Sequence, residues 1–201
     1  DWPGCYGYML VPTAEKAQVL FPDLILDKSK AWTEMIHRYA AGILGFIILA
    51  ILILALKYRK QSNHPLSMII FISALVIFQA LLGMWTVTMQ LLPLVVMAHL
   101  LGGFSLLACL AWLLLQLRTP RSSITITESQ HYRPWILVGL FILVMQIALG
   151  GWVSANYAAL ACVGFPACNG QLIPSLNFAS AFQLISPLGI NYEGGVLDSI
   201  S

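Results

Sequence analysis

Charged residues are scarce in this chain. Only 9% of its 201 residues are Asp, Glu, Lys or Arg, whereas 59% are hydrophobic. Soluble domains carry roughly 25% charged residues. Three long blocks, residues 39–56, 65–117 and 134–192, hold no charged residue at all. A soluble domain of this length could not bury so much apolar surface, so the composition excludes a water-soluble fold and favours a protein embedded in lipid.

The sequence also lacks a basic surface and a leader segment. Its net charge is only +2, and the Lys and Arg residues form no stripe interleaved with aromatic residues, which excludes a nucleic-acid-binding surface. The chain begins with Asp1, shows no signal peptide, and ends in the polar segment 194–201. We therefore expect both ends to be cuts through loops of a longer protein.

The charge-free blocks supply enough apolar chain for four membrane crossings, since each crossing needs roughly 20 such residues. The middle block is long enough for two helices and breaks near Gln90, just before Pro93, because Pro is favoured in the first turn of a helix. The predicted fold class is an all-α integral membrane protein. Its four transmembrane helices are expected at about 35–56, 66–87, 92–117 and 135–155.

Basic residues fix the direction of these helices, because short loops rich in Lys and Arg stay on the cytoplasmic side of a membrane. Such residues follow the first and third spans: Lys57, Arg59, Lys60, Arg118, Arg121 and Arg133. The turn at 88–92 holds none, and neither does the chain after Arg133 until its end. Segments 1–34, 88–92 and 156–201 are therefore predicted to lie outside, on the periplasmic side of a bacterial inner membrane.

Three of the four cysteines fall in the segments predicted to lie outside, where thiols tend to be oxidised: Cys5, Cys162 and Cys168. The loop from Cys162 to Cys168 is short and contains Gly and Pro, so we predict a disulfide between them. The alternatives are two free thiols or two metal ligands, but no neighbouring Cys or His supports a metal site. Cys109 lies inside a predicted helix and is expected to be a small apolar residue.

Two motifs occur twice. Residues 2–7 (WPGCYG) resemble residues 165–170 (FPACNG), and residues 79–87 (QALLGMWTV) resemble residues 146–153 (QIALGGWV). Internal repeats in membrane proteins usually indicate two bundles related by a pseudo-symmetry axis.

The repeat predicts how the chain divides. Residues 1–133 are expected to form most of a first bundle that lacks its first helix, and residues 134–201 to begin a second bundle. Because Cys5 aligns with Cys168, which has a neighbouring cysteine before it, Cys5 is expected to form a disulfide with a partner that lies outside this sequence, before Asp1.

Two of the four histidines lie in the outer halves of predicted membrane helices. His37 is at the outer end of the first span, and His99 lies about 10 Å below the outer end of the third. His64 and His131 lie beside basic residues at the cytoplasmic surface and are expected to be solvated. An ionisable residue in a membrane helix is costly and is a functional candidate by default. For His99 the alternative is an interhelical hydrogen bond.

Two neutral imidazoles from different helices can bind the two faces of a haem iron. Arg38 is placed to pair with haem propionates, or else to anchor the helix at the lipid headgroups. Small residues would leave room for a flat macrocycle, although they are also how membrane helices pack. They are Ala40, Ala41, Gly42 and Gly45 after His37, and Gly102, Gly103 and Ser105 after His99.

Together these motifs resemble the haem A synthase family. The resemblance runs through essentially all 201 residues and is carried by residues 34–38 (EMIHR), 83–87 (GMWTV) and 96–100 (VMAHL), with the repeated Pro-x-Cys-x-Gly loop. It implies an eight-helix membrane protein made of two pseudo-symmetric four-helix halves, each with a histidine pair.

The resemblance also implies an activity, namely oxidation of a ring methyl of haem O to a formyl group with water as the oxygen source. His37 and His99 would then bind the substrate haem, and Glu34 would be the reactive acid, suited to act as a base because it lies on the His37 face of its helix. A haem b cofactor would occupy the second half, with ligands beyond residue 201. The implied partners are haem O, the enzyme that produces haem O, the lipid bilayer and further copies of the chain.

Two other functions are compatible with the residues. A bis-histidine cytochrome b would only pass electrons, and it would have little need of an acid such as Glu34. A transporter would need a polar site at the membrane midplane, for which the span interiors offer few residues apart from His99. The other role for Glu34 is that of an exposed carboxylate in the first turn of a helix, favoured by the helix dipole.

Overall fold

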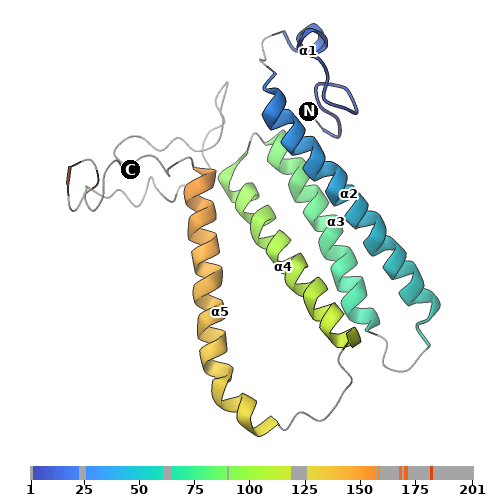
Figure 1. Ribbon diagram of the computed structural model, residues 1–201, viewed down its shortest axis with the longest axis vertical. Coiled ribbons are helices and arrows are strands. Elements are labelled where there is room, and N and C mark those ends of the chain that lie inside the picture. Colours follow the sequence, from blue (N-terminus) through green and yellow to red (C-terminus); the bar gives the residue numbers. More distant parts are fainter. Residues whose placement is uncertain are drawn as a thin grey trace. The chain divides into compact units, whose positions relative to one another are not determined.

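The computed structural model describes residues 2–22, 26–60, 65–89, 91–118 and 126–156, and the single positions 158, 168, 170, 171 and 182. Regular structure in these residues is helical (Figure 1), and the helices are α1 (Ala14–Leu20), α2 (Lys28–Lys57), α3 (Leu66–Thr88), α4 (Pro93–Arg118) and α5 (Ile126–Ala155). Helices α2 to α5 are long and apolar enough to cross a membrane. The predicted all-α class with four spans is therefore confirmed, whereas the short helix α1 was not predicted.

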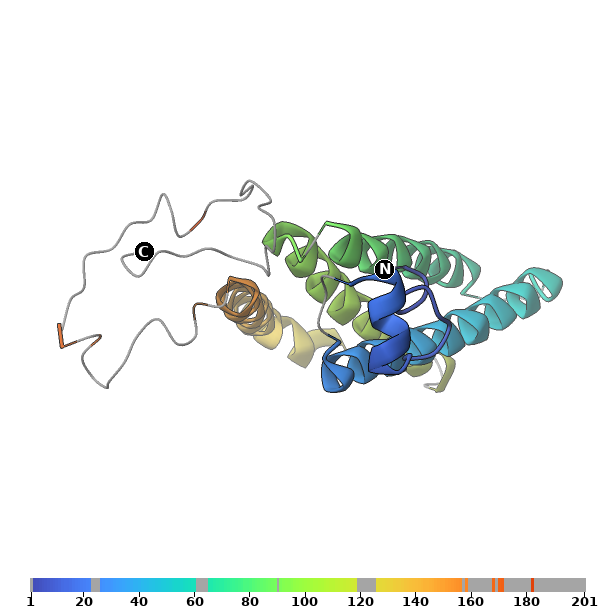
Figure 2. The same cartoon turned by 90° about the horizontal axis from the view of Figure 1, so that it is seen from above.

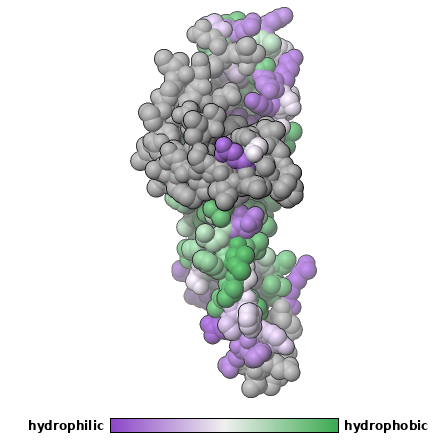
Figure 3. Space-filling model, turned by 90° about the vertical axis from the view of Figure 1, so that its left-hand side faces the viewer, coloured by the Kyte–Doolittle hydropathy of each residue, from purple (hydrophilic) through white to green (hydrophobic). Residues whose placement is uncertain are grey.

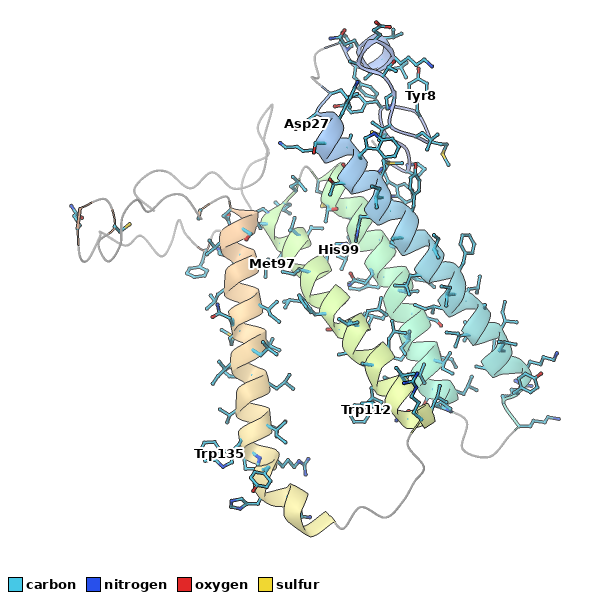
Figure 4. All side chains as sticks on the ribbon, viewed as in Figure 1. Tyr8, Asp27, Met97, His99, Trp112 and Trp135 are labelled. Atoms are coloured by element: carbon cyan, nitrogen blue, oxygen red, sulfur yellow. The ribbon has the colours of Figure 1, made fainter. Side chains whose placement is uncertain are left out.

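Helix α2 starts well before the apolar run that predicted it. The Asp27 carboxylate accepts hydrogen bonds from the backbone N–H groups of Ser29 (2.9 Å) and Lys30 (3.2 Å), and so caps the helix (Figure 4). The first turn of α2 consequently holds no acidic residue, and Glu34 lies in the second turn. The alternative role of Glu34 as a first-turn carboxylate is wrong, because the cap at Asp27 adds about two turns to the helix.

The chain forms two compact units: the first is Asp1–Thr88 with Leu106–Leu113, and the second is Met89–Ser105 with Leu114–Ser201. These units reflect packing within the chain, and the predicted division into halves at residue 133 stays a prediction. In the first unit, α2 and α3 lie side by side and pack with the middle of α4 (Figure 1). The core of this packing consists of Ile48, Ala55, Ile69, Ile72, Leu106 and Leu113.

The N-terminal segment covers the N-terminal end of α2 (Figure 2), which the topology prediction places on the outer side. Cys5 is buried there against Ala31 and Met35, two residues one turn apart on α2, and Tyr6 and Val11 pack around them. The position of the loop is therefore set by one face of the first two turns of α2.

In the second unit, α5 approaches the outer part of α4 at Gly151. A Cβ atom at Gly151 would lie only 2.6 Å from Leu100 Cδ2 and 2.8 Å from Met97 Sδ. The rest of α5 has an exposed apolar surface, visible as a hydrophobic band with hydrophilic residues at its lower end in Figure 3. Exposed Trp135 lies near that lower end (Figure 4), as expected for an aromatic residue at a membrane interface.

The two loop copies adopt the same turn. Cys5 and Tyr8 exchange backbone hydrogen bonds of 2.7 and 3.0 Å, and Cys168 and Gln171 exchange bonds of 2.8 and 2.9 Å. The glycine before the last residue of each turn has a positive φ, +79° at Gly7 and +81° at Gly170, a conformation that disfavours residues with a Cβ atom. The repeated Cys-x-Gly pattern in the sequence thus encodes a repeated backbone turn.

The close contact at Gly151 gives a test of α4–α5 packing. Gly151→Ile should lower the free energy of unfolding of the full-length protein in detergent by roughly 1–3 kcal/mol, because overpacking forces the helices apart. The unfolding temperature should fall with it. Gly150→Ile is the matched control, since a Cβ atom at Gly150 meets no atom within 4 Å. Equal unfolding temperatures for the two variants would contradict the packing.

Candidate functional site

Arg38 joins the N-terminal loop to Glu34 near the N-terminal end of α2. Its Nη1 group donates hydrogen bonds to the backbone carbonyl oxygens of Gly4 (2.6 Å) and Pro3 (3.2 Å), and its Nη2 group forms an ion pair with the Glu34 carboxylate. The Arg38 side chain is only 18% exposed, whereas that of Glu34 is 51% exposed. The guanidinium thus fixes the N-terminal loop and Glu34 at the same time.

A second hydrogen bond holds the far side of this loop. The Tyr39 hydroxyl donates to the backbone carbonyl oxygen of Met9 at 2.6 Å. Sequence reasoning missed this role of Tyr39 and the loop-binding role of Arg38. The only signal was the pair of adjacent hydrogen-bonding side chains at the start of an apolar helix, and nothing in the sequence identified backbone carbonyls as their partners.

Cys5 belongs to this loop and is buried between the loop and α2, with 9% of the residue exposed. Burial raises the pKa of the Cys5 thiol, and the nearby Glu34 carboxylate raises it further, while the Arg38 guanidinium acts in the opposite direction. Burial also raises the pKa of the Tyr6 hydroxyl, with smaller contributions from Cys5 and Glu34. Because only the thiolate is a strong nucleophile, this environment keeps Cys5 weakly reactive at neutral pH.

His37 lies on the core-facing stripe of α2. It precedes the buried Ile48 by three helical turns, and Leu44 lies between them on the same stripe and packs against the core. The His37 side chain is exposed at this outer end. A Cβ atom at Gly42 or Gly45 would meet no atom within 4 Å, so there is open space on α2 inward of His37.

His99 belongs to the second unit. It lies in the outer part of α4, after the buried Met97 (Figure 4), and its Nδ1 atom is buried. A Cβ atom at Gly103, one turn further on, would again meet open space. The convergence of the two predicted iron ligands on one iron stays a prediction because they belong to different units.

The remaining predicted site residues differ in how far the structure describes them. Cys162 and His64 lie outside the described residues, so the Cys162–Cys168 disulfide stays a prediction, as does a disulfide from Cys5 to a cysteine before Asp1. His131 is exposed, as expected for a solvated residue. No group of three or more His, Cys, Asp or Glu side chains in the described ranges is placed to hold a metal ion.

Gln79 was noted in the sequence only as part of a repeat. In the structure it is buried in α3, with 6% of the residue exposed, and neither polar atom of its amide has a hydrogen-bond partner among the described residues. The available signal was its place inside a charge-free block, residues 65–117, where a polar side chain is unusual.

Known proteins resemble this chain along most of its length. A family model described as "Cytochrome oxidase assembly protein" matches residues 1–188. A haem A synthase of Shewanella oneidensis is 50% identical over 202 residues, which cover 98% of this chain and 60% of that protein. A haem A synthase of Shouchella clausii is 27% identical, and the match covers 87% of this chain and 55% of that protein. A haem A synthase of Alkalihalophilus pseudofirmus is 26% identical, and the match covers 99% of this chain and 61% of that protein. The chain thus spans about three fifths of the length of these relatives, and no solved structure matches it.

The hydrogen bonds of Arg38 predict that the N-terminal loop detaches from α2 when the guanidinium is removed. Arg38→Gln should speed tryptic cleavage after Lys16 by about tenfold or more, because hydrogen bonds to a charged donor hold the loop closed. Lys57→Gln, which removes a cation from the other end of α2, is the control and should leave this cleavage unchanged. Cleavage of the Arg38 variant at the wild-type rate would show that the loop is held by other contacts.

The environment of Cys5 predicts a specific pH dependence. In the reduced full-length protein, Glu34→Gln should shift the pH profile of Cys5 alkylation to lower pH, because the carboxylate that raises the thiol pKa is gone and more thiolate is present at each pH. Alkylation of the Cys5 peptide is quantified by mass spectrometry. Glu15→Gln is the control for removing an acidic residue from the same segment, and identical profiles for both variants would refute the influence of Glu34.

Proposed function

This chain belongs to the family of cytochrome oxidase assembly proteins, and from that membership we propose that the full-length protein is a haem A synthase. It would oxidise one ring methyl of haem O to a formyl group and so supply haem A for cytochrome oxidase. The reaction removes electrons and protons from a carbon atom and takes an oxygen atom from water. The protein therefore has to hold the macrocycle, pass on electrons and accept protons.

The observation that carries this proposal is the arrangement of Glu34 and Arg38 beside His37. The ion pair with Arg38 fixes the Glu34 carboxylate one turn before His37, while half of the Glu34 side chain stays open to solvent. A carboxylate in this position can accept a proton near the macrocycle and release it to water at the outer membrane surface. A protein that only carried electrons would not need such a group.

His37 and His99 are the residues we propose as ligands of the haem O iron. Imidazole is a good ligand for haem iron, and these are the two histidines that lie in the apolar spans away from the basic loops. When bound, the iron supplies the redox chemistry of the site. Arg38 is the candidate for contact with the haem propionates.

The second half of the protein would complete the activity. We propose eight transmembrane helices in two four-helix halves, with a haem b cofactor in the second half held by histidines beyond residue 201. This haem would serve as the one-electron carrier that accepts electrons from the substrate site. Haem O would reach the first half from the enzyme that produces it, and assembly into homo-oligomers is part of the same proposal.

The proposed location is a bacterial inner membrane with the cysteine loops on the periplasmic side. The basic residues after α2 and α4 support this orientation. We further propose that Cys162 and Cys168 form a disulfide in the oxidising space. Cys5 and Cys109 are the free thiols of the described part of the chain, and Cys168 is not among them, which supports this pairing.

Two variants of the full-length protein distinguish the proposed catalytic carboxylate, Glu34, from a proposed ligand of the haem iron, His99. Glu34→Gln keeps the size of the side chain but cannot accept a proton as a carboxylate does. Haem O should still bind, while formyl product falls by about 10²- to 10⁴-fold. His99→Ala should instead lose haem from the first half or leave it five-coordinate.

The measurements are chromatography of the extracted haems and the reduced-minus-oxidised spectrum of each variant. Glu15→Gln and His131→Ala are the controls for loss of a carboxylate and of an imidazole outside the site. Haem A production by Glu34→Gln at the wild-type rate would refute the catalytic role of Glu34 and favour a bis-histidine electron carrier.

A further inference from the structure

Gln79 differs from the other hydrogen-bonding side chains of α3. The hydroxyls of Ser73, Thr86 and Thr88 each donate to a backbone carbonyl of the preceding turn, at 2.8, 2.7 and 3.2 Å. These hydroxyls are therefore satisfied within their own helix. Both polar atoms of the Gln79 amide are buried instead, and the described part of the chain offers them no hydrogen bond.

An amide in this position calls for a hydrogen-bond partner beyond the described residues. Leaving a buried donor and acceptor unsatisfied is costly, and lipid supplies no water to replace the missing partner. The amide both donates through Nε2 and accepts through Oε1, so the group that matches it best also does both. A hydroxyl group on a bound molecule has that property.

The position of Gln79 relates it to the proposed haem site. Gln79 follows the core residue Ile72 by two turns on α3, and His37 precedes the core residue Ile48 by three turns on the antiparallel α2. Both residues thus continue the core-facing stripes of their helices toward the outer side. If Ile48 and Ile72 mark the same depth in the core, Gln79 lies about one to two turns deeper in the membrane than His37.

We propose that Gln79 binds the hydroxyl of the substrate's hydroxyalkyl side chain and makes the site selective for haem O. This inference rests on the proposed function, in which His37 binds the haem O iron. The charged propionates of a haem avoid lipid and lie toward the outer surface, so the opposite edge of the macrocycle points inward, to the depth of Gln79. That edge carries the hydroxyalkyl chain of haem O, where haem B has a vinyl group.

The selectivity follows from the free energy that is lost when the Gln79 amide is buried without a hydrogen-bond partner. With haem O, the hydroxyl of the substrate satisfies Gln79. With haem B, the vinyl group leaves the same amide buried and unsatisfied, so the wrong haem is rejected by a polar group in the site. The protein would thereby distinguish haem O from haem B without any charged residue in the membrane interior.

The test uses full-length protein whose second half already holds its haem b, and it compares the affinities of the first half for haem O and haem B by spectroscopic titration in detergent. Wild type should bind haem O about 10- to 100-fold more tightly than haem B, the effect expected from one buried hydrogen bond. Gln79→Leu should bring the ratio of the two dissociation constants near one, mainly through tighter binding of haem B. Gln116→Leu, which replaces an exposed glutamine near the C-terminal end of α4, should keep the wild-type ratio.

Three results would overturn the inference: equal affinities in wild type, an unchanged ratio in Gln79→Leu, or a parallel loss of both haems in that variant. The last result would mean that Gln79 bonds another helix. Because binding is measured without turnover, wild type that prefers haem O but forms no formyl product would refute the proposed function and leave the selectivity of Gln79 intact.

Discussion

The constraint on which this structure depends is that lipid cannot form hydrogen bonds. In the membrane interior every polar group must find a partner within the protein or on a ligand, which is why the spanning segments are helical. The serine and threonine hydroxyls of α3 obey this rule by bonding to their own helix. Groups that break the rule mark function, and the buried amide of Gln79 is the clearest case among the described side chains.

At the outer end of α2 the same constraint is relaxed, and polar groups gather there. Asp27 extends the helix past its apolar run, Arg38 ties the loop of Cys5 to the helix, and Glu34 is held by the same guanidinium beside His37. A carboxylate that is fixed in place and still open to water is suited to proton transfer. Chemistry on a lipid-soluble macrocycle needs this meeting of an apolar binding site with an aqueous edge.

The sequence predicted the parts of the fold that follow from composition. Long charge-free blocks gave the four spans, and the repeated Cys-x-Gly pattern predicted that the two loops would be alike, as the turns at Cys5 and Cys168 confirm. The helix α1 and the early start of α2 were missed, since α1 has only seven residues and the start of α2 depends on a cap at Asp27. The role of Arg38 was missed because its partners are backbone carbonyls of Pro3 and Gly4, and a carbonyl carries no sequence signal. Gln79 was visible in the sequence, but only its burial distinguishes it from the exposed Gln146.

The central claim is that the full-length protein converts haem O to haem A. The most direct measurement is extraction and chromatography of the haems from membranes that contain the full-length protein, receive haem O and have no other source of haem A. The account predicts that haem A appears and haem O declines in step with it. Membranes that retain all their haem O and yield only haem B with the purified protein would contradict the claim and identify an electron-carrying cytochrome instead.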